Sequence, residues 1–186
     1  YFQPKDIVGG DFYWYRSFNH LAVIATVDCT GHGVPGGFMS MMGSLLLDKI
    51  VQKHQLETPE ILAHLNQEII RVLKQDSGGE IQDGMDISLC LIDKNKNEMH
   101  FSGARNGILL VQNGDVKQYK ADLLPVGGKF TLKSKKQTRT YQKQVISLNE
   151  NDWVFMYSDG YHDQVGGEKF TSFGMRNFEN LLKKID

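Results

Sequence analysis

The chain of 186 residues lacks several features that would place it in a specialised class. No uninterrupted apolar run approaches the ~18 residues of a membrane-spanning helix, and the first residues do not have the regions of a signal peptide. Its two cysteines, Cys29 and Cys90, are too few for a disulfide framework, so we expect a reducing, cytoplasmic setting. Lys and Arg number 21 against 22 Asp and Glu, and this balance argues against a protein that coats nucleic acid or an anionic membrane.

The remaining composition is that of an ordinary globular domain. Hydrophobic residues make up 40% of the chain and charged residues 23%, which is too apolar for a disordered protein. The length fits a single domain, residues 1–186, that can fold without a disulfide or a metal. Glycine is the exception, because its 19 residues cluster beside acidic residues and so indicate close approaches of the backbone to other groups.

Hydrophobic periodicity predicts the order strands, two helices, many strands, one helix. The connections are hairpins rather than repeated βαβ units, so we expect an α+β fold with a largely antiparallel sheet. Strands are predicted at 11–18, 21–28, 85–91, 98–102, 107–112, 115–119, 138–147 and 153–158, and helices at 38–54, 58–76 and 172–184.

Two helices show apolar faces that are predicted to point into the core. The residues concerned are Phe38, Met41, Met42, Leu45, Leu46 and Ile50 in the first helix and Phe178, Leu181, Leu182 and Ile185 in the last.

Three aspartates stand where an apolar strand meets glycine. Asp11 follows two glycines, Asp28 ends the run LAVIATVD, and Asp159 lies in YSDG. Each alone has the simpler interpretation of a turn or cap residue, but together they predict a shared cation, because a carboxylate at a buried strand end needs a partner. All are hard oxygen donors, which favours Mg²⁺ or Mn²⁺ and disfavours Zn²⁺.

The loop DCTGHGVPGG opens a predicted helix and contains four glycines. Backbone N–H groups at the start of a helix favour anions, so a phosphate nearby is physically reasonable. The loop lacks the Gly-Lys-Ser/Thr of a Walker A sequence, so a nucleotide-binding enzyme is disfavoured.

Five blocks occur in a fixed order: GGDFYW, VDCTGHGVPGGFMSMMG, DGMDISLC, FSGARNG and YSDGYHDQ. Together they resemble the SpoIIE-type (stage II sporulation E) branch of the metal-dependent Ser/Thr protein phosphatases, the PPM or type-2C class. The resemblance implies an α-β-β-α sandwich and two divalent cations, Mn²⁺ or Mg²⁺, bridged by Asp28. It further implies metal contacts from the Cys29 carbonyl, Asp11 and Asp159, with Asp86, or else Asp83, at an additional cation or its waters.

The reaction that this resemblance implies is hydrolysis of a phosphomonoester by a metal-activated water. His32 is the candidate donor of a proton to the leaving alkoxide, with a purely structural hydrogen bond as the alternative. Lys5 and Arg105 are candidates for anchoring the substrate phosphate, with a plain surface position as the alternative for each.

The family also implies partners. We expect a phosphorylated signalling protein of the anti-sigma-factor-antagonist type as substrate, an upstream sensor domain, a possible homodimer and no nucleic acid. Family members normally close with a strand that carries an Asp-Asp pair, and we expect this chain to be truncated before it, at the cost of a last metal ligand. The alternative function is a catalytically silent module that binds a phosphoprotein or relays a signal.

Overall fold

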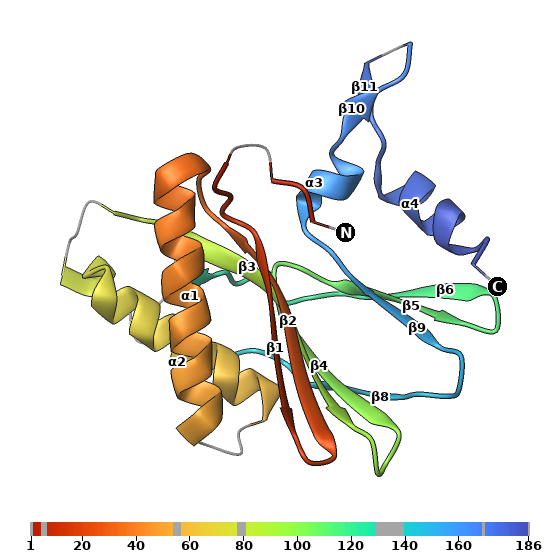
Figure 1. Ribbon diagram of the computed structural model, residues 1–186, viewed down its shortest axis with the longest axis horizontal. Helices are drawn as coiled ribbons and strands as arrows, with labels where there is room; N and C mark the ends of the chain where they lie inside the picture. The colour runs from red at the N-terminus through yellow and green to blue at the C-terminus, as the bar shows by residue number, and fades with distance from the viewer. Residues whose placement is uncertain are drawn as a thin grey trace.

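The computed structural model describes residues 2–4, 7–53, 57–77, 81–128, 140–168 and 170–185 (Figure 1). The elements are β1 (Phe12–Phe18), β2 (Leu21–Cys29), α1 (Gly33–Lys53), α2 (Thr58–Val72), the 3₁₀ turn η1 (Gln75–Ser77), β3 (Gly84–Asp93), β4 (Glu98–Ala104), β5 (Ile108–Gln112), β6 (Asp115–Tyr119), β7 (Val126–Gly127), β8 (Gln144–Ser147), β9 (Trp153–Met156), α3 (Asp159–His162), β10 (Val165–Gly166), β11 (Thr171–Ser172) and α4 (Met175–Leu182).

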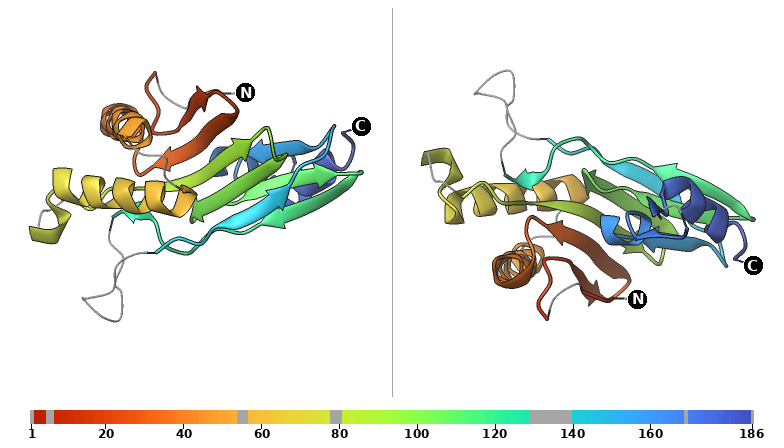
Figure 2. Two further views of the ribbon diagram at one scale, coloured as in Figure 1. Left: turned by 90° about the horizontal axis from the view of Figure 1, so that it is seen from below. Right: turned by 90° about the horizontal axis from the view of Figure 1, so that it is seen from above.

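The strands form two main antiparallel sheets, as the sequence predicts. The larger sheet has the order β1-β2-β3-β4-β8, with β7 paired to β3, and the smaller has the order β6-β5-β9. Helices α1 and α2 lie on the side of the molecule opposite α4 (Figures 1 and 2). The predicted α+β class and the sandwich of sheets flanked by helices are therefore confirmed. No helix among the described residues is long and apolar enough to span a membrane.

Three apolar clusters correspond to the three interfaces of the layers. The first joins the larger sheet to α1 and α2, the second lies between the sheets, and the third joins the smaller sheet to α4. Side chains of one strand alternate between clusters: Leu89 packs toward the helices and Cys90 toward the second sheet. Leu110 likewise faces the first sheet while Leu109 faces α4. This alternation is the period of two expected for strands covered on both faces.

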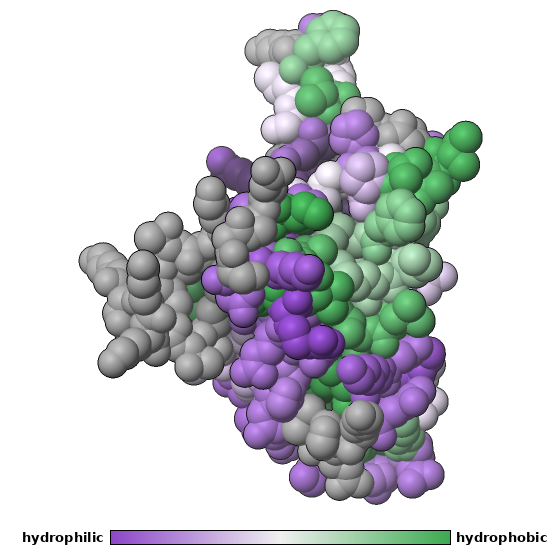
Figure 3. All heavy atoms as spheres, turned by 90° about the vertical axis from the view of Figure 1, so that its left-hand side faces the viewer, coloured by the Kyte–Doolittle hydropathy of each residue, from purple (hydrophilic) through white to green (hydrophobic). Residues whose placement is uncertain are grey.

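The predicted inward faces of two helices are partly wrong. Phe38, Met41 and Leu45 on α1 are 63%, 56% and 62% exposed, and Leu181 on α4 is 42% exposed. Apolar residues surround much of α1, so spacing alone does not identify the side that meets the sheet. Figure 3 views the side of the molecule on which α1 and α2 lie and shows apolar side chains at the surface. The buried apolar side chains of α1 are Met39, Leu46, Leu47, Ile50 and Val51.

Several boundaries differ from those predicted, among them those of α1, β8 and β9. Helix α1 begins at Gly33, inside the glycine-rich loop, rather than at residue 38. Strand β8 occupies only Gln144–Ser147, and of the rest of its predicted span, 138–139 lie outside the described residues. Strand β9 ends at Met156, and Asp159 is the first residue of the short helix α3 instead of the last residue of a strand.

Candidate active site

Three aspartates lie side by side at one edge of the larger sheet, and an arginine contacts the last of them. Strand pairing places Asp28 on β2 directly opposite Asp86 on β3. The register of β1 with β2, continued by one residue beyond β1, brings Asp11 opposite Asp28, and Arg105, which follows β4, places its guanidinium 3.6 Å from the Asp86 carboxylate. Because residues directly opposite each other in antiparallel strands share a face, the three aspartates form a row with Arg105 at its end, and we call these four residues the charged row.

The charged row points toward the second sheet rather than toward the helices. Val27 and Cys29, the neighbours of Asp28 along β2, belong to the cluster under α1 and α2, so Asp28 itself faces the other way. Asp159 reaches this side from the end of β9, and its backbone N–H donates to the Asp28 carboxylate. The site is thus built where the two sheets meet.

One side chain links the two halves of this site. The amide of Asn106 donates to the backbone carbonyl of Tyr157, two residues before Asp159. The buried Ser88 hydroxyl donates to the carbonyls of Asn106 and Gly107, at 3.0 and 2.8 Å, and so holds Asn106 against β3. This link sets the position of α3 relative to the charged row.

The carboxylates influence one another strongly. The pKa of Asp28 is raised from 3.8 to about 7, first by burial, then by the negative charges of Asp11 and Asp159. Burial also raises the pKa of Asp86, against the opposing effect of Arg105. The pKa of the buried Cys29 thiol is raised by burial and by Asp28, so this cysteine is a neutral core residue and no nucleophile.

Glycines let two loops pack closely together beside the charged row. A Cβ on Gly36 would lie 2.7 Å from the carbonyl oxygen of Gly31 and 3.0 Å from Cα of Gly10, and a Cβ on Gly10 would lie 3.0 Å from the carbonyl oxygen of Cys29. No side chain fits between these backbones. Thr30 ties the loop to β3, because its hydroxyl lies 3.1 Å from both N and O of Gly84. The clustering of glycine in the sequence therefore reflects backbone packing around Asp28.

The predicted residues are placed as follows. Asp11, Asp28, Asp159 and Asp86 come together from distant parts of the chain, with Arg105 beside them at the end of the row. His32 is exposed and immediately precedes α1. Lys5 lies outside the described residues, and Asp83 presents its backbone carbonyl to the Gln75 side chain at 2.6 Å.

Hard oxygen ligands of this kind fit Mg²⁺ or Mn²⁺. Within the described ranges, no three His, Cys, Asp or Glu side chains are already arranged around one position that could hold a metal ion. The donor set nevertheless fits a divalent cation, since Asp28 sits among like charges that a cation would neutralise, as its raised pKa records.

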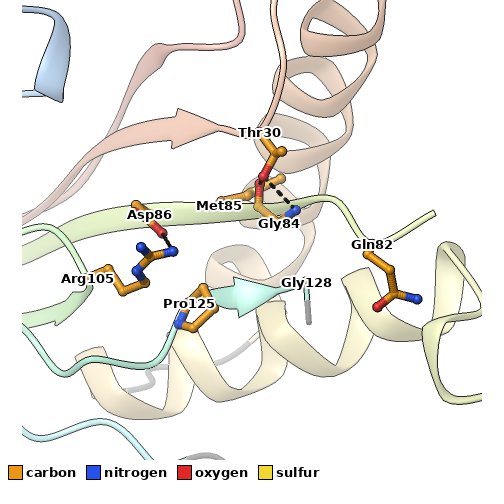
Figure 4. A pocket seen from close by; sticks show the side chains of 8 residues that line it. All are labelled: Thr30, Gln82, Gly84, Met85, Asp86, Arg105, Pro125 and Gly128. Atoms are coloured by element: carbon orange, nitrogen blue, oxygen red, sulfur yellow. Dashed lines mark hydrogen bonds and ion pairs between the residues drawn. The ribbon is translucent and has the colours of Figure 1, made fainter. Parts of the chain in front are cut away.

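A small cavity of about 190 Å³ adjoins the charged row (Figure 4). Asp86 and Arg105 point toward one another at its wall, 3.6 Å apart, and Pro125 of the loop before β7 lies below them. The side chain of Gln75 holds the chain just after β7, because its Oε1 accepts from the N–H of Gly128 at 3.1 Å.

Sequence reasoning missed the roles of Asn106, Ser88 and Thr30. All three lie inside the blocks FSGARNG, DGMDISLC and DCTGHG, which was a usable signal. Their partners, however, are 18 to 54 residues away along the chain, so the pattern could not show what they bond.

Comparisons with known proteins agree with this arrangement. A family model described as Stage II sporulation protein E (SpoIIE) matches residues 19–186. The SiaA-PP2C domain of Pseudomonas aeruginosa superposes with a TM-score of 0.84 and 28% identity, over 97% of this chain and 68% of that chain. No curated protein matches the chain.

Two further solved structures share the fold at lower identity. The PP2C phosphatase domain with a fragment of the regulatory domain of SpoIIE from Bacillus subtilis has a TM-score of 0.72 and 19% identity, over 97% of this chain and 48% of that one. The RsbU and RsbW domains of a Mycobacterium tuberculosis protein have a TM-score of 0.71 and 19% identity, over 95% of this chain and 46% of that one. The chain thus spans less than half the length of these two relatives.

Proposed function

The chain belongs to the Stage II sporulation protein E (SpoIIE) family of PP2C-type phosphatase domains, and from this premise we propose that it hydrolyses phosphoserine or phosphothreonine on a protein with the help of two divalent cations, Mn²⁺ or Mg²⁺. The observation that carries the proposal is the convergence of Asp11, Asp28 and Asp159 on one place, with the cation Arg105 in the same row.

In this proposal the chain's own groups have distinct tasks. Asp28, Asp11 and Asp159 hold the cations, together with the carbonyl of Cys29. When bound, such a pair of cations lowers the pKa of a water and turns it into a nucleophile at neutral pH. The hydrogen bond from the Asn106 amide to the Tyr157 carbonyl holds Asp159 beside the charged row, so the carboxylates are in position before a cation binds.

Arg105 and His32 act on the substrate in this proposal. Asp86 lies one strand spacing, about 5 Å, from Asp28, and the Arg105 guanidinium lies 3.6 Å from Asp86, so the long arginine side chain can reach a phosphate held near Asp28. The Arg105 guanidinium is therefore assigned to the phosphate, for which its fork of N–H donors is suited. His32, exposed at the start of α1, is assigned to protonating the leaving alkoxide.

The protein substrate is proposed from the relatives. One solved relative contains RsbU and RsbW domains in the same protein, which supports a phosphorylated partner of the anti-sigma-factor-antagonist type. We also propose a sensor domain in the full-length protein, a homodimer and a cytoplasmic location.

The test is hydrolysis of a phosphoserine peptide and of p-nitrophenyl phosphate by the full-length protein, with Mn²⁺ or with a chelator. We expect activity only with Mn²⁺, and a loss of at least about 100-fold in kcat/KM in Asp28→Asn. Asp115→Asn, the same change of charge on the exposed strand β6, should keep wild-type activity. Equal activity with the chelator, or in Asp28→Asn, would overturn the proposal.

A further inference from the structure

The cavity beside the charged row has the size of a subsite rather than of a complete ligand pocket. Its volume of about 190 Å³ is below the ~300–1,000 Å³ of clefts that hold drug-sized ligands, and suits one amino-acid side chain. Its lining mixes polar side chains, among them Thr30 and Gln82, with the apolar side chains of Met85 and Pro125. Because Asp86 stands directly opposite Asp28, the cavity lies next to the place where a phosphate would be cleaved.

Asp86 is the group in this cavity whose interactions are incomplete. Its side chain is only 33% exposed, and among the residues that the structure describes its one ion pair is to Arg105, at 3.6 Å. No hydrogen-bond donor among the described residues reaches its carboxylate. A half-buried carboxylate of this kind would be stabilised by an additional cationic donor.

The backbone of Arg105 is held by hydrogen bonds, whereas its guanidinium group is largely exposed. Its N–H donates to the carbonyl of Asp122 at 2.7 Å, it bridges to Ile87, and its φ of 59° is a left-handed conformation that these bonds hold in place. The side chain itself is 55% exposed and bonded only loosely to Asp86. It can therefore turn toward a phosphate at Asp28, but it cannot serve the phosphate and Asp86 fully at the same time.

We propose that the cavity is a subsite for a basic side chain, Lys or Arg, next to the phosphorylated residue of the substrate, and that Asp86 selects it. The inference rests on the proposed function, since Arg105 leaves Asp86 only when it binds the phosphate. The substrate's cation then replaces Arg105 at Asp86, so the exchange leaves neither carboxylate nor phosphate unpaired. Asp86 is in this view a specificity-determining residue.

The experiment compares three phosphoserine peptides that differ only in the neighbouring residue, which is Lys, Ala or Glu. The Mn²⁺-loaded full-length protein is expected to cleave the Lys peptide with a kcat/KM about tenfold above that of the Ala peptide, the size expected of a partly buried charge pair. In Asp86→Asn the ratio should fall to about one. Asp115→Asn should keep the ratio, and Asp86→Glu should retain part of it, which separates loss of charge from loss of folding.

Each of the other outcomes contradicts either the subsite or the proposed function. A wild-type ratio near one, a preference for the Glu peptide, or a Lys preference that survives in Asp86→Asn overturns the subsite while the phosphatase stands. An Asp86→Asn variant that binds Mn²⁺ about tenfold more weakly by calorimetry with an unchanged peptide ratio identifies Asp86 as a metal ligand instead. Failure to cleave any of the three peptides overturns the proposed function itself, and the subsite with it.

Discussion

Replacing Asp28 by Asn should stabilise the metal-free protein, and by an amount that depends on pH. In the folded protein the pKa of Asp28 is raised from 3.8 to about 7, by burial first and then by Asp11 and Asp159. Between these two values the folded state binds a proton more readily than the unfolded state, so the free energy of unfolding falls as the pH rises from about 4 to about 7. Asp28→Asn removes the charge, so the variant should not lose this part of the free energy of unfolding as the pH rises.

The magnitude follows from the same pKa. A rise from 3.8 to about 7 corresponds to ~4 kcal/mol at 1.36 kcal/mol per pKa unit. Because Asp28 is only half-buried, water and salt screen the interaction, and we expect about 1–2 kcal/mol. A divalent cation bound at the carboxylates should make the wild type more stable than Asp28→Asn, since a ligand at 100 times its Kd stabilises the folded state by about 2.7 kcal/mol.

The assay is urea unfolding at pH 5 and at pH 8, with a chelator and with Mn²⁺. With the chelator, the free energy of unfolding of Asp28→Asn should exceed that of the wild type by about 1–2 kcal/mol at pH 8 and by less at pH 5. With Mn²⁺, the wild type should gain stability and the variant should gain little. Asp115→Asn is the control for the loss of one negative charge elsewhere. A variant less stable than the wild type at pH 8, or one that gains as much from Mn²⁺, would refute the electrostatic reasoning.

Two further substitutions test the frame of the site. Gly36→Ala brings a Cβ to 2.7 Å from the Gly31 carbonyl oxygen and should lower the free energy of unfolding by about 1–3 kcal/mol, whereas Gly166→Ala, with nothing within 4 Å, should change it little; urea unfolding of both variants checks this. Asn106→Ala removes the donor to the Tyr157 carbonyl and should cost about 1–2 kcal/mol and also weaken Mn²⁺ binding by calorimetry; unchanged Mn²⁺ affinity would separate this link from the metal site.

Local patterns in the sequence predicted the strands well, because burial on both faces leaves a visible period. The alternation of Leu89 and Cys90 between two clusters is of this kind. The proximity of the three aspartates was also predictable, since carboxylates near the ends of buried strands are unfavourable unless they have a partner. The buried face of α1 was predicted partly wrongly for the opposite reason. Its apolar residues surround the helix axis, so their spacing does not show that Phe38 is exposed.

The contacts that complete the site depend on register, which no local pattern carries. Asp86 and Arg105 are 19 positions apart, and only the pairing of β3 with β4 makes them neighbours. The Asn106 amide likewise donates to a carbonyl 51 residues away, that of Tyr157 directly after β9. A single slip of register would turn such a side chain to the opposite face, so these pairs follow from the assembled sheets and not from the motifs that contain them.

The division of the site between two sheets has a consequence for its behaviour. Asp28 belongs to the larger sheet and Asp159 follows the smaller one, so a relative movement of the layers changes the distance between two carboxylates that repel each other. In the metal-free protein this repulsion pushes the layers apart at the site, while the apolar cluster between the sheets and the Asn106 link hold them together. Cations that neutralise the carboxylates would remove the repulsion, and metal binding should therefore tighten the contact between the sheets as well as supply the chemistry.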